Sequence, residues 1–146
     1  MTTLTWLIRY GHILGGAVWV GGYALLALLI IPLLERERSA LLADLAIAAV
    51  RVLTYAGTLT IGFGLVLITR TRGFANLFSG EWGALVIASF VMAIILLGIG
   101  DGAIRPALRR LGAGGDGTNA RRWALAGFAL TVLTIGMMTR ALYAPS

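Results

Sequence analysis

The chain has no cysteine and no lysine, and it has a single histidine, His12. Without cysteine there is no disulfide framework, thiolate metal site, iron–sulfur cluster or cysteine nucleophile. Charge is also scarce, because only 12% of the 146 residues are charged, whereas soluble domains carry about 25%. These shortages exclude a disordered tail and argue against an ordinary soluble enzyme.

Apolar residues are abundant instead, at 59% of the chain, and the mean hydropathy is +0.92. A membrane span needs about 20 consecutive apolar residues, and four runs meet that length. The predicted spans cover about residues 4–34, 40–69, 82–102 and 121–142. We therefore expect an all-α integral membrane four-helix bundle in the lipid bilayer, forming a single transmembrane domain over residues 1–146. We see no long internal repeat.

The 12 arginines stand mainly at the ends of the apolar runs. That placement indicates membrane topology rather than a nucleic-acid partner, in spite of the net charge of +6. One side of the expected bundle carries seven: Arg36, Arg38, Arg105, Arg109, Arg110, Arg121 and Arg122. The other side carries Arg9, Arg70, Arg72 and Arg140. The positive-inside rule makes the seven-arginine side cytoplasmic, so both termini are expected outside, with an uncleaved first span.

His12 lies inside the first span, where an ionisable residue is costly and is a functional candidate by default. Gly15 and Gly16 lie one turn further on and leave flat space against the helix. A porphyrin needs such a space beside an axial imidazole. Arg9 lies one turn nearer the outer surface, where a guanidinium could pair with a heme propionate. The alternative is ordinary helix packing, because Gly11 and Gly15 also form a small-xxx-small pattern.

A second axial ligand is less evident. Met138 reaches a depth similar to that of His12 in the fourth span, and His/Met ligation of heme is chemically sound. Methionine in an apolar helix is more often filler, so His12 alone, or His12 from each copy of a homodimer, remains open. Arg140 near the same end is either a second propionate partner or a snorkelling interface residue.

A stripe of small and polar residues follows one face of the second span. We expect this face to point into the bundle, since polar groups avoid lipid. Its members are Asp44, Ala48, Arg51, Tyr55, Thr58 and Gly62. Asp44, Arg51 and Tyr55 on this face suggest an internal salt bridge or a proton or anion path.

The segment from His12 to Gly22, with Trp19-Val-Gly-Gly seven residues after the histidine, resembles the first-helix signature of CopD-like membrane proteins. HemJ-type protoporphyrinogen oxidases are broadly similar. The resemblance is confined mainly to residues 7–30. It implies a bacterial inner (plasma) membrane protein that handles copper or binds heme b, with His12 as the family histidine. The chain departs from both patterns, because it has no second histidine, no Met-rich copper segment and no lysine.

Together, these features favour a heme-b-binding membrane protein in electron transfer or another membrane redox reaction. The expected cofactor-binding residues are His12, Arg9, Gly15, Gly16, Met138 and Arg140, with His12 and Met138 as metal ligands. Two alternatives stay open. One is a copper-handling permease that uses His12 and Met138, and the other is a cofactor-free accessory subunit of a larger membrane complex. A role as part of a membrane oxidoreductase is left undecided.

Overall fold

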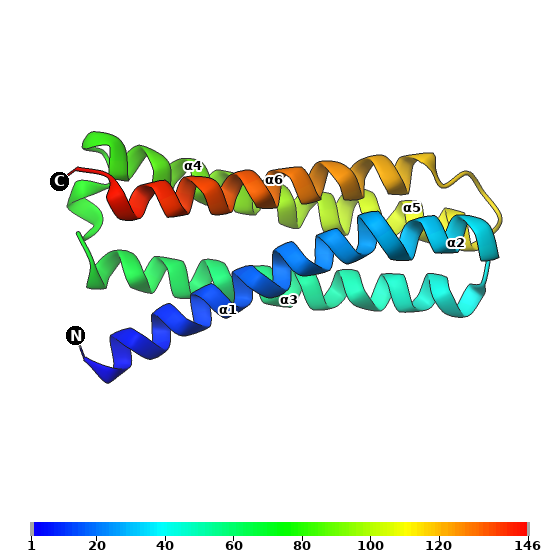
Figure 1. The fold of residues 1–146 in the computed structure, drawn as a ribbon, viewed down its shortest axis with the longest axis horizontal. Helices are drawn as coiled ribbons and strands as arrows, with labels where there is room; N and C mark the ends of the chain where they lie inside the picture. The colour runs from blue at the N-terminus through cyan, green and yellow to red at the C-terminus, as the bar shows by residue number, and fades with distance from the viewer. Residues whose placement is uncertain (1, 146) are drawn as a thin grey trace.

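A computed structural model describes residues 2–145 as four long helical rods (Figure 1). The first rod comprises α1 (Thr3–Leu25), η1 (Leu26–Ile30) and α2 (Ile31–Glu37), and the second is α3 (Ala40–Arg70). A short turn η2 (Phe74–Asn76) leads to the third rod, which comprises α4 (Gly80–Gly98), η3 (Ile99–Ile104) and α5 (Arg105–Gly112). The fourth rod is α6 (Thr118–Tyr143). All four are long and apolar enough to cross a membrane, which confirms the predicted all-α bundle.

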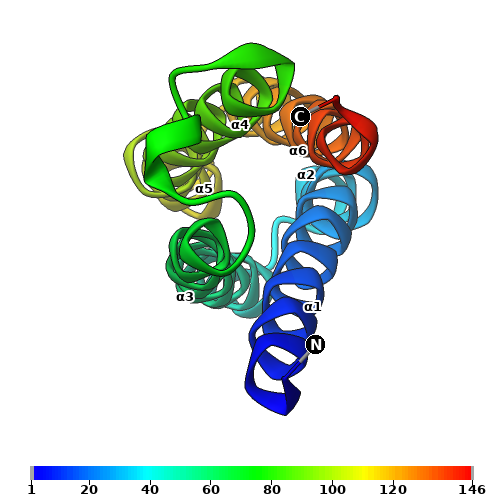
Figure 2. The same ribbon diagram turned by 90° about the vertical axis from the view of Figure 1, so that its left-hand side faces the viewer.

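The rods form a ring in the order α1, α3, α4–α5, α6, and both termini lie at the same end (Figures 1 and 2). The first part of α1 diverges from α6 and lies along α3, whereas its later part and α2 rejoin α6. The third rod is longer than the predicted span, because the helix continues past Gly102 to Gly112. The strongly amphipathic α5, with apolar Leu108 and Leu111 buried and Arg109 and Arg110 exposed, sustains this extension.

Each of the two broken rods contains a π-helical segment shortly before a proline. Pro32 follows η1 and Pro106 follows η3. Proline has no backbone N–H and crowds the preceding turn, so a regular α-helix cannot run through it without a defect. The wider π turn, closed by bonds from Ile31 to Leu26 and from Arg105 to Gly100, provides that local adjustment.

The two helical hairpins place their π segments, prolines and long helices in the same order. Pro32 and Pro106 are 74 positions apart, and at the same offset η1 falls on η3 and α3 falls on α6. Ile30, Pro32, Leu34 and Arg36 match Ile104, Pro106, Leu108 and Arg110 at this offset. Leu-Thr-Ile-Gly at residues 59–62 recurs at 133–136. Most other residues paired at this offset differ, so the expectation of no long internal repeat stays a prediction.

Charged residues lie in two planes across the bundle. Arg70, Glu81 and Arg140 lie near one end, and Arg51, Asp101 and Arg121 lie 19 or 20 residues further along the same rods. A helix rises 1.5 Å per residue, so the planes are about 30 Å apart, the thickness of a bilayer hydrocarbon core. Apart from Arg122, which adjoins the second plane, these three segments carry no charged residue between the planes. Beyond the second plane α3 and α5 continue for 11 residues, to Ala40 and Gly112, or roughly 16 Å. Helix α6 continues for only three residues, to Thr118.

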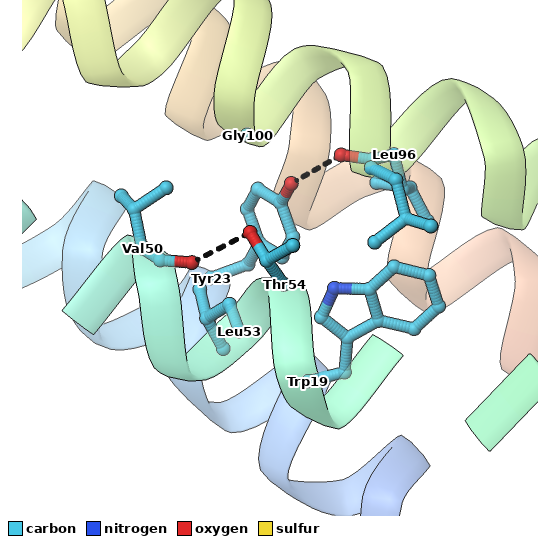
Figure 3. Close-up of a pocket in the computed structure, with 8 residues that line it drawn as sticks. Trp19, Tyr23, Val50, Leu53, Thr54, Leu96 and Gly100 are labelled. Carbon is cyan, nitrogen blue, oxygen red and sulfur yellow. Dashed lines mark hydrogen bonds between the residues drawn. The ribbon is translucent and has the colours of Figure 1, made fainter. Parts of the chain in front are cut away.

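The centre of the bundle is organised by Tyr23, which is 1% exposed. Its hydroxyl donates a hydrogen bond of 2.7 Å to the carbonyl of Leu96 (Figure 3). Its ring lies against Gly127 of α6, where any Cβ would overlap it. Trp19, one turn earlier, packs against Gly57 of α3. The space among these side chains holds no room for a water molecule, so this level of the bundle is closed.

The prediction of an inward polar stripe on the second span is wrong. Asp44, Ala48, Arg51, Tyr55, Thr58 and Gly62 are all exposed on α3. The buried face is shifted by about one residue and is mostly small and apolar: Ala43, Ala46, Val50, Leu53, Gly57, Thr60 and Ile68. Close packing against α1 requires small side chains, and this requirement outweighs the tendency of polar groups to face inward.

We expect Gly127→Ala to destabilise the protein by about 1–3 kcal/mol, since the new methyl group overpacks the buried Tyr23 ring. Gly136→Ala on the same helix is the control, because no atom lies within 4 Å of its added Cβ. Removing a helical glycine there should stabilise by about 0.5–1 kcal/mol. Unfolding of both variants in detergent, followed by circular dichroism, checks this. Equal stability of the two variants would contradict the packing assigned to Tyr23.

Candidate functional site

His12 lies on the face of α1 that packs against α3. Its Nδ1 is 2.8 Å from the backbone carbonyl oxygen of Thr60. A carbonyl only accepts, so Nδ1 carries the hydrogen and donates it. In the neutral ring Nε2 then keeps its lone pair, and Nε2 has no hydrogen-bond partner within residues 2–145. The imidazole is thus held in one tautomer with one nitrogen available.

Glycines set the close approach that makes this hydrogen bond possible. A Cβ at Gly64 would lie 3.1 Å from Cε1 of His12, so the edge of the imidazole fits against bare α3 backbone. A Cβ at Gly15 would overlap the hydroxyl of Thr60, and one at Gly11 would lie 2.8 Å from the ring of Phe63. The face formed by Gly11 and Gly15 is therefore filled by α3.

The structure consequently corrects the role expected for Gly15. It does not offer flat space to a porphyrin, because α3 occupies that space. Gly16 differs, since a Cβ added there would meet no atom within 4 Å. Residues four apart share a helix face, so Gly16 leaves open surface one turn beyond His12. Arg9, three residues before His12, is exposed.

Met138 is not brought to His12. The contacts of His12 are with Thr60 and Gly64 of α3. Met138 lies in the last part of α6, where α6 runs beside α4 and the hydroxyl of Thr134 reaches the sulfur of Met92. Figures 1 and 2 show the first part of α1 well separated from the end of α6. The rise per residue predicts similar depths for Met138 and His12 along their helices. Equal depth does not decide how far apart the two helices lie.

Arg140 also has a partner other than a propionate. Its Nε lies 2.6 Å from Oε1 of Glu81, and its Nη2 lies 3.1 Å from Oε2. This bidentate pair ties α6 to the start of α4. Nearby, Arg72 donates to the carbonyls of Ala144 and Pro145, 2.9 and 3.0 Å away, and its guanidinium lies over the Trp82 ring. These contacts connect the loop after α3 to the C-terminal segment.

A second polar cluster was not identified from the sequence as one site. It lies at the seam between α3 and η3, on the second charged plane, and surrounds a cavity of about 240 Å³. Its lining residues are Arg51, Thr54, Tyr55, Asp101 and Arg105. The spacing of Asp101 and Arg105 correctly predicted their ion pair, which measures 2.5 Å. The sequence pattern predicts Arg51 and Tyr55 inside the bundle. It therefore does not predict that they approach the Asp101–Arg105 ion pair.

No family model matches the chain, and comparisons with curated proteins and with solved structures also gave no match.

We expect the Glu81–Arg140 pair to contribute only weakly to stability, as exposed ion pairs do. A double-mutant cycle with Glu81→Gln and Arg140→Gln, read from unfolding in detergent, measures this coupling. Raising the salt concentration to about 1 M should reduce it, because screening is then strong over about 3 Å. A coupling near zero at low salt would show that Arg140 is free for another partner.

Proposed function

We propose that this multi-pass membrane protein binds heme b through Nε2 of His12 and takes part in electron transfer or another membrane redox reaction. In this proposal the seven-arginine end faces the cytoplasm of a bacterial inner membrane and both termini lie outside. The resemblance of the first helix to HemJ-type proteins supports heme binding, whereas its resemblance to CopD-like proteins fits the copper alternative. Heme, when bound, would supply reversible one-electron chemistry at the outer half of the bundle.

The observation that carries the proposal is the hydrogen bond from His12 Nδ1 to the Thr60 carbonyl. Histidines that ligate metals almost always donate their other ring N–H to a carbonyl, carboxylate or water, which fixes the ring and raises its basicity. Here a backbone carbonyl of a neighbouring helix performs that role. The position of Thr60 is in turn constrained by its packing against Gly15.

The surroundings of His12 suit a porphyrin on the side of Gly16 rather than Gly15. Gly16 leaves open surface there, and Ile13 and Leu14 are exposed apolar neighbours. Arg9 lies one turn towards the outer end, where a propionate would reach water. A porphyrin brings four nitrogen ligands of its own, so a protein with one histidine can hold it.

Copper handling is less well supported by the donor set. A copper site without a macrocycle draws its ligands from the protein, yet residues 2–145 contain no group of three His, Cys, Asp or Glu side chains suited to a metal. Met138, the expected partner of His12, is placed with α4. A bound heme would be held by His12 alone or by His12 from each of two copies.

We expect His12→Ala to lose the Soret band and the sharp reduced α and β bands of the detergent-purified protein, while the variant still inserts and folds. The comparison is made on oxidised and dithionite-reduced samples expressed with heme available. Retention of the heme spectrum by His12→Ala would exclude His12 as the ligand. A colourless wild-type protein that remains fully helical would exclude the proposal itself.

A second experiment tests on which side of His12 the porphyrin lies. Gly16→Leu should reduce heme content severalfold, because it fills the open surface beside His12. Gly136→Leu is the matched control, since Gly136 also has open surroundings but lies on α6. Equal heme content in these two variants would show that the porphyrin does not lie against Gly16.

A further inference from the structure

The seam between α3 and η3 contains a polar cavity that the heme proposal does not use. Asp101 accepts from Arg105 and also from Thr54, whose hydroxyl lies 3.1 Å from Oδ1. Both bonds go to Oδ1 of Asp101, and Arg51 makes no ion pair within the described chain. The cavity lining therefore carries two arginines against one carboxylate.

Arg105 lines the same pocket, which has a volume of about 240 Å³. Its Nε is buried and makes no hydrogen bond within residues 2–145. This nitrogen is closed off from water, so a ligand in the pocket would meet the other nitrogens of Arg105 and those of Arg51. The pocket is far larger than the roughly 10–15 Å³ that one water needs.

The polar residues of this seam have no polar counterparts at the positions 74 residues away. The equivalent seam, between α6 and η1, is built from the positions 74 residues away. Asp101 and Arg105 correspond to Ala27 and Ile31, and Arg51, Thr54 and Tyr55 correspond to Leu125, Phe128 and Ala129. Every counterpart is apolar. Ala27 and Ile31 are buried, whereas Asp101 is exposed, so the polar residues line a surface that their apolar counterparts do not.

The position of the cavity indicates the kind of ligand. Arg51 and Asp101 lie on the second charged plane, about 30 Å from the first, so the cavity is at the depth of lipid headgroups on the seven-arginine side. Tyr55 lies one turn nearer the hydrocarbon core and is 70% exposed, as is typical of interfacial tyrosines. Arginine matches the geometry of phosphate oxygens, and a phosphate diester brings an anion to this level.

We propose that the cavity lined by Arg51, Thr54, Tyr55, Asp101 and Arg105 is a binding site for a phosphate group. Arg51 provides the free guanidinium, and Arg105 supports it while held by Asp101. The phosphate belongs either to an anionic phospholipid headgroup or to a soluble phosphate ester from the cytoplasmic side. Both sources present the same oxygens, and the experiment below distinguishes them.

The test uses the full-length, delipidated protein in detergent and native mass spectrometry. Phosphatidylglycerol is titrated first, and glycerol 3-phosphate and inorganic phosphate are titrated separately. We expect Arg51→Leu, which copies the residue of the apolar seam, to weaken binding about tenfold, the size of one charge-assisted hydrogen bond. Arg122→Leu is the control, because Arg122 is an exposed arginine at a similar depth on α6. It should change binding by less than about twofold.

Each result has a defined meaning. Arg51-dependent binding of phosphatidylglycerol alone assigns a lipid site, and Arg51-dependent binding of glycerol 3-phosphate or phosphate assigns a soluble ligand. Equal binding by Arg51→Leu and Arg122→Leu, or binding of none of the three probes, would overturn the proposal. Since Arg51 is exposed, the variant should fold, and circular dichroism verifies this. Heme content should be unaffected, because the pocket is at the level of Tyr23, where Thr54 lines both spaces, and His12 is about three turns away along α1.

Discussion

The contact between α1 and α3 is the constraint on which the rest of the structure depends. Gly11, Gly15 and Gly22 of α1, and Gly57 and Gly64 of α3, present bare backbone to side chains of the partner helix. In lipid there is little hydrophobic gain from helix association, so close van der Waals contact between small residues must supply it. The contact fixes the depth and rotation of α1, and with them the positions of His12, Trp19 and Tyr23.

That contact also explains why α1 can leave α6 at its N-terminal end and remain ordered. The packing along α3 continues as far as Gly11, so α1 does not need α6 there. The imidazole of His12 is therefore oriented by a single neighbouring helix, while the other side of α1 stays accessible at Gly16. The imidazole is thus held rigidly while the surface beside it stays open, and a bound cofactor requires both features.

The two hairpins share their order of helices, π segments and prolines. At the offset of 74 residues His12 pairs with Val86, and the charged seam beside η3 pairs with an apolar one beside η1. Positions that match along the two hairpins therefore carry different chemistry at both candidate sites.

The predictions that held concern properties spread along the whole chain. The four long apolar helices, the helical class and the pairing of Asp101 with Arg105 follow from long apolar runs and from spacing of three or four residues. The failed predictions depend on neighbours that are distant in sequence. The stripe residues from Asp44 to Gly62 share one face of α3. Their spacing does not show whether α1 packs against that face or against another face of α3. Met138 and His12 match in depth, but depth does not decide which helices are adjacent.

The sequence alone thus determined that the chain forms long apolar helices and that His12 lies within one of them, because hydropathy and helical period are local properties. Only the tertiary structure decided that Gly15 is buried and Gly16 open, that Thr60 orients the imidazole, and that Arg140 pairs with Glu81. It also decided that Arg51 meets Asp101 and Arg105. Each depends on how helices rotate against one another, which is set by the summed fit of small residues across the bundle rather than by any single segment.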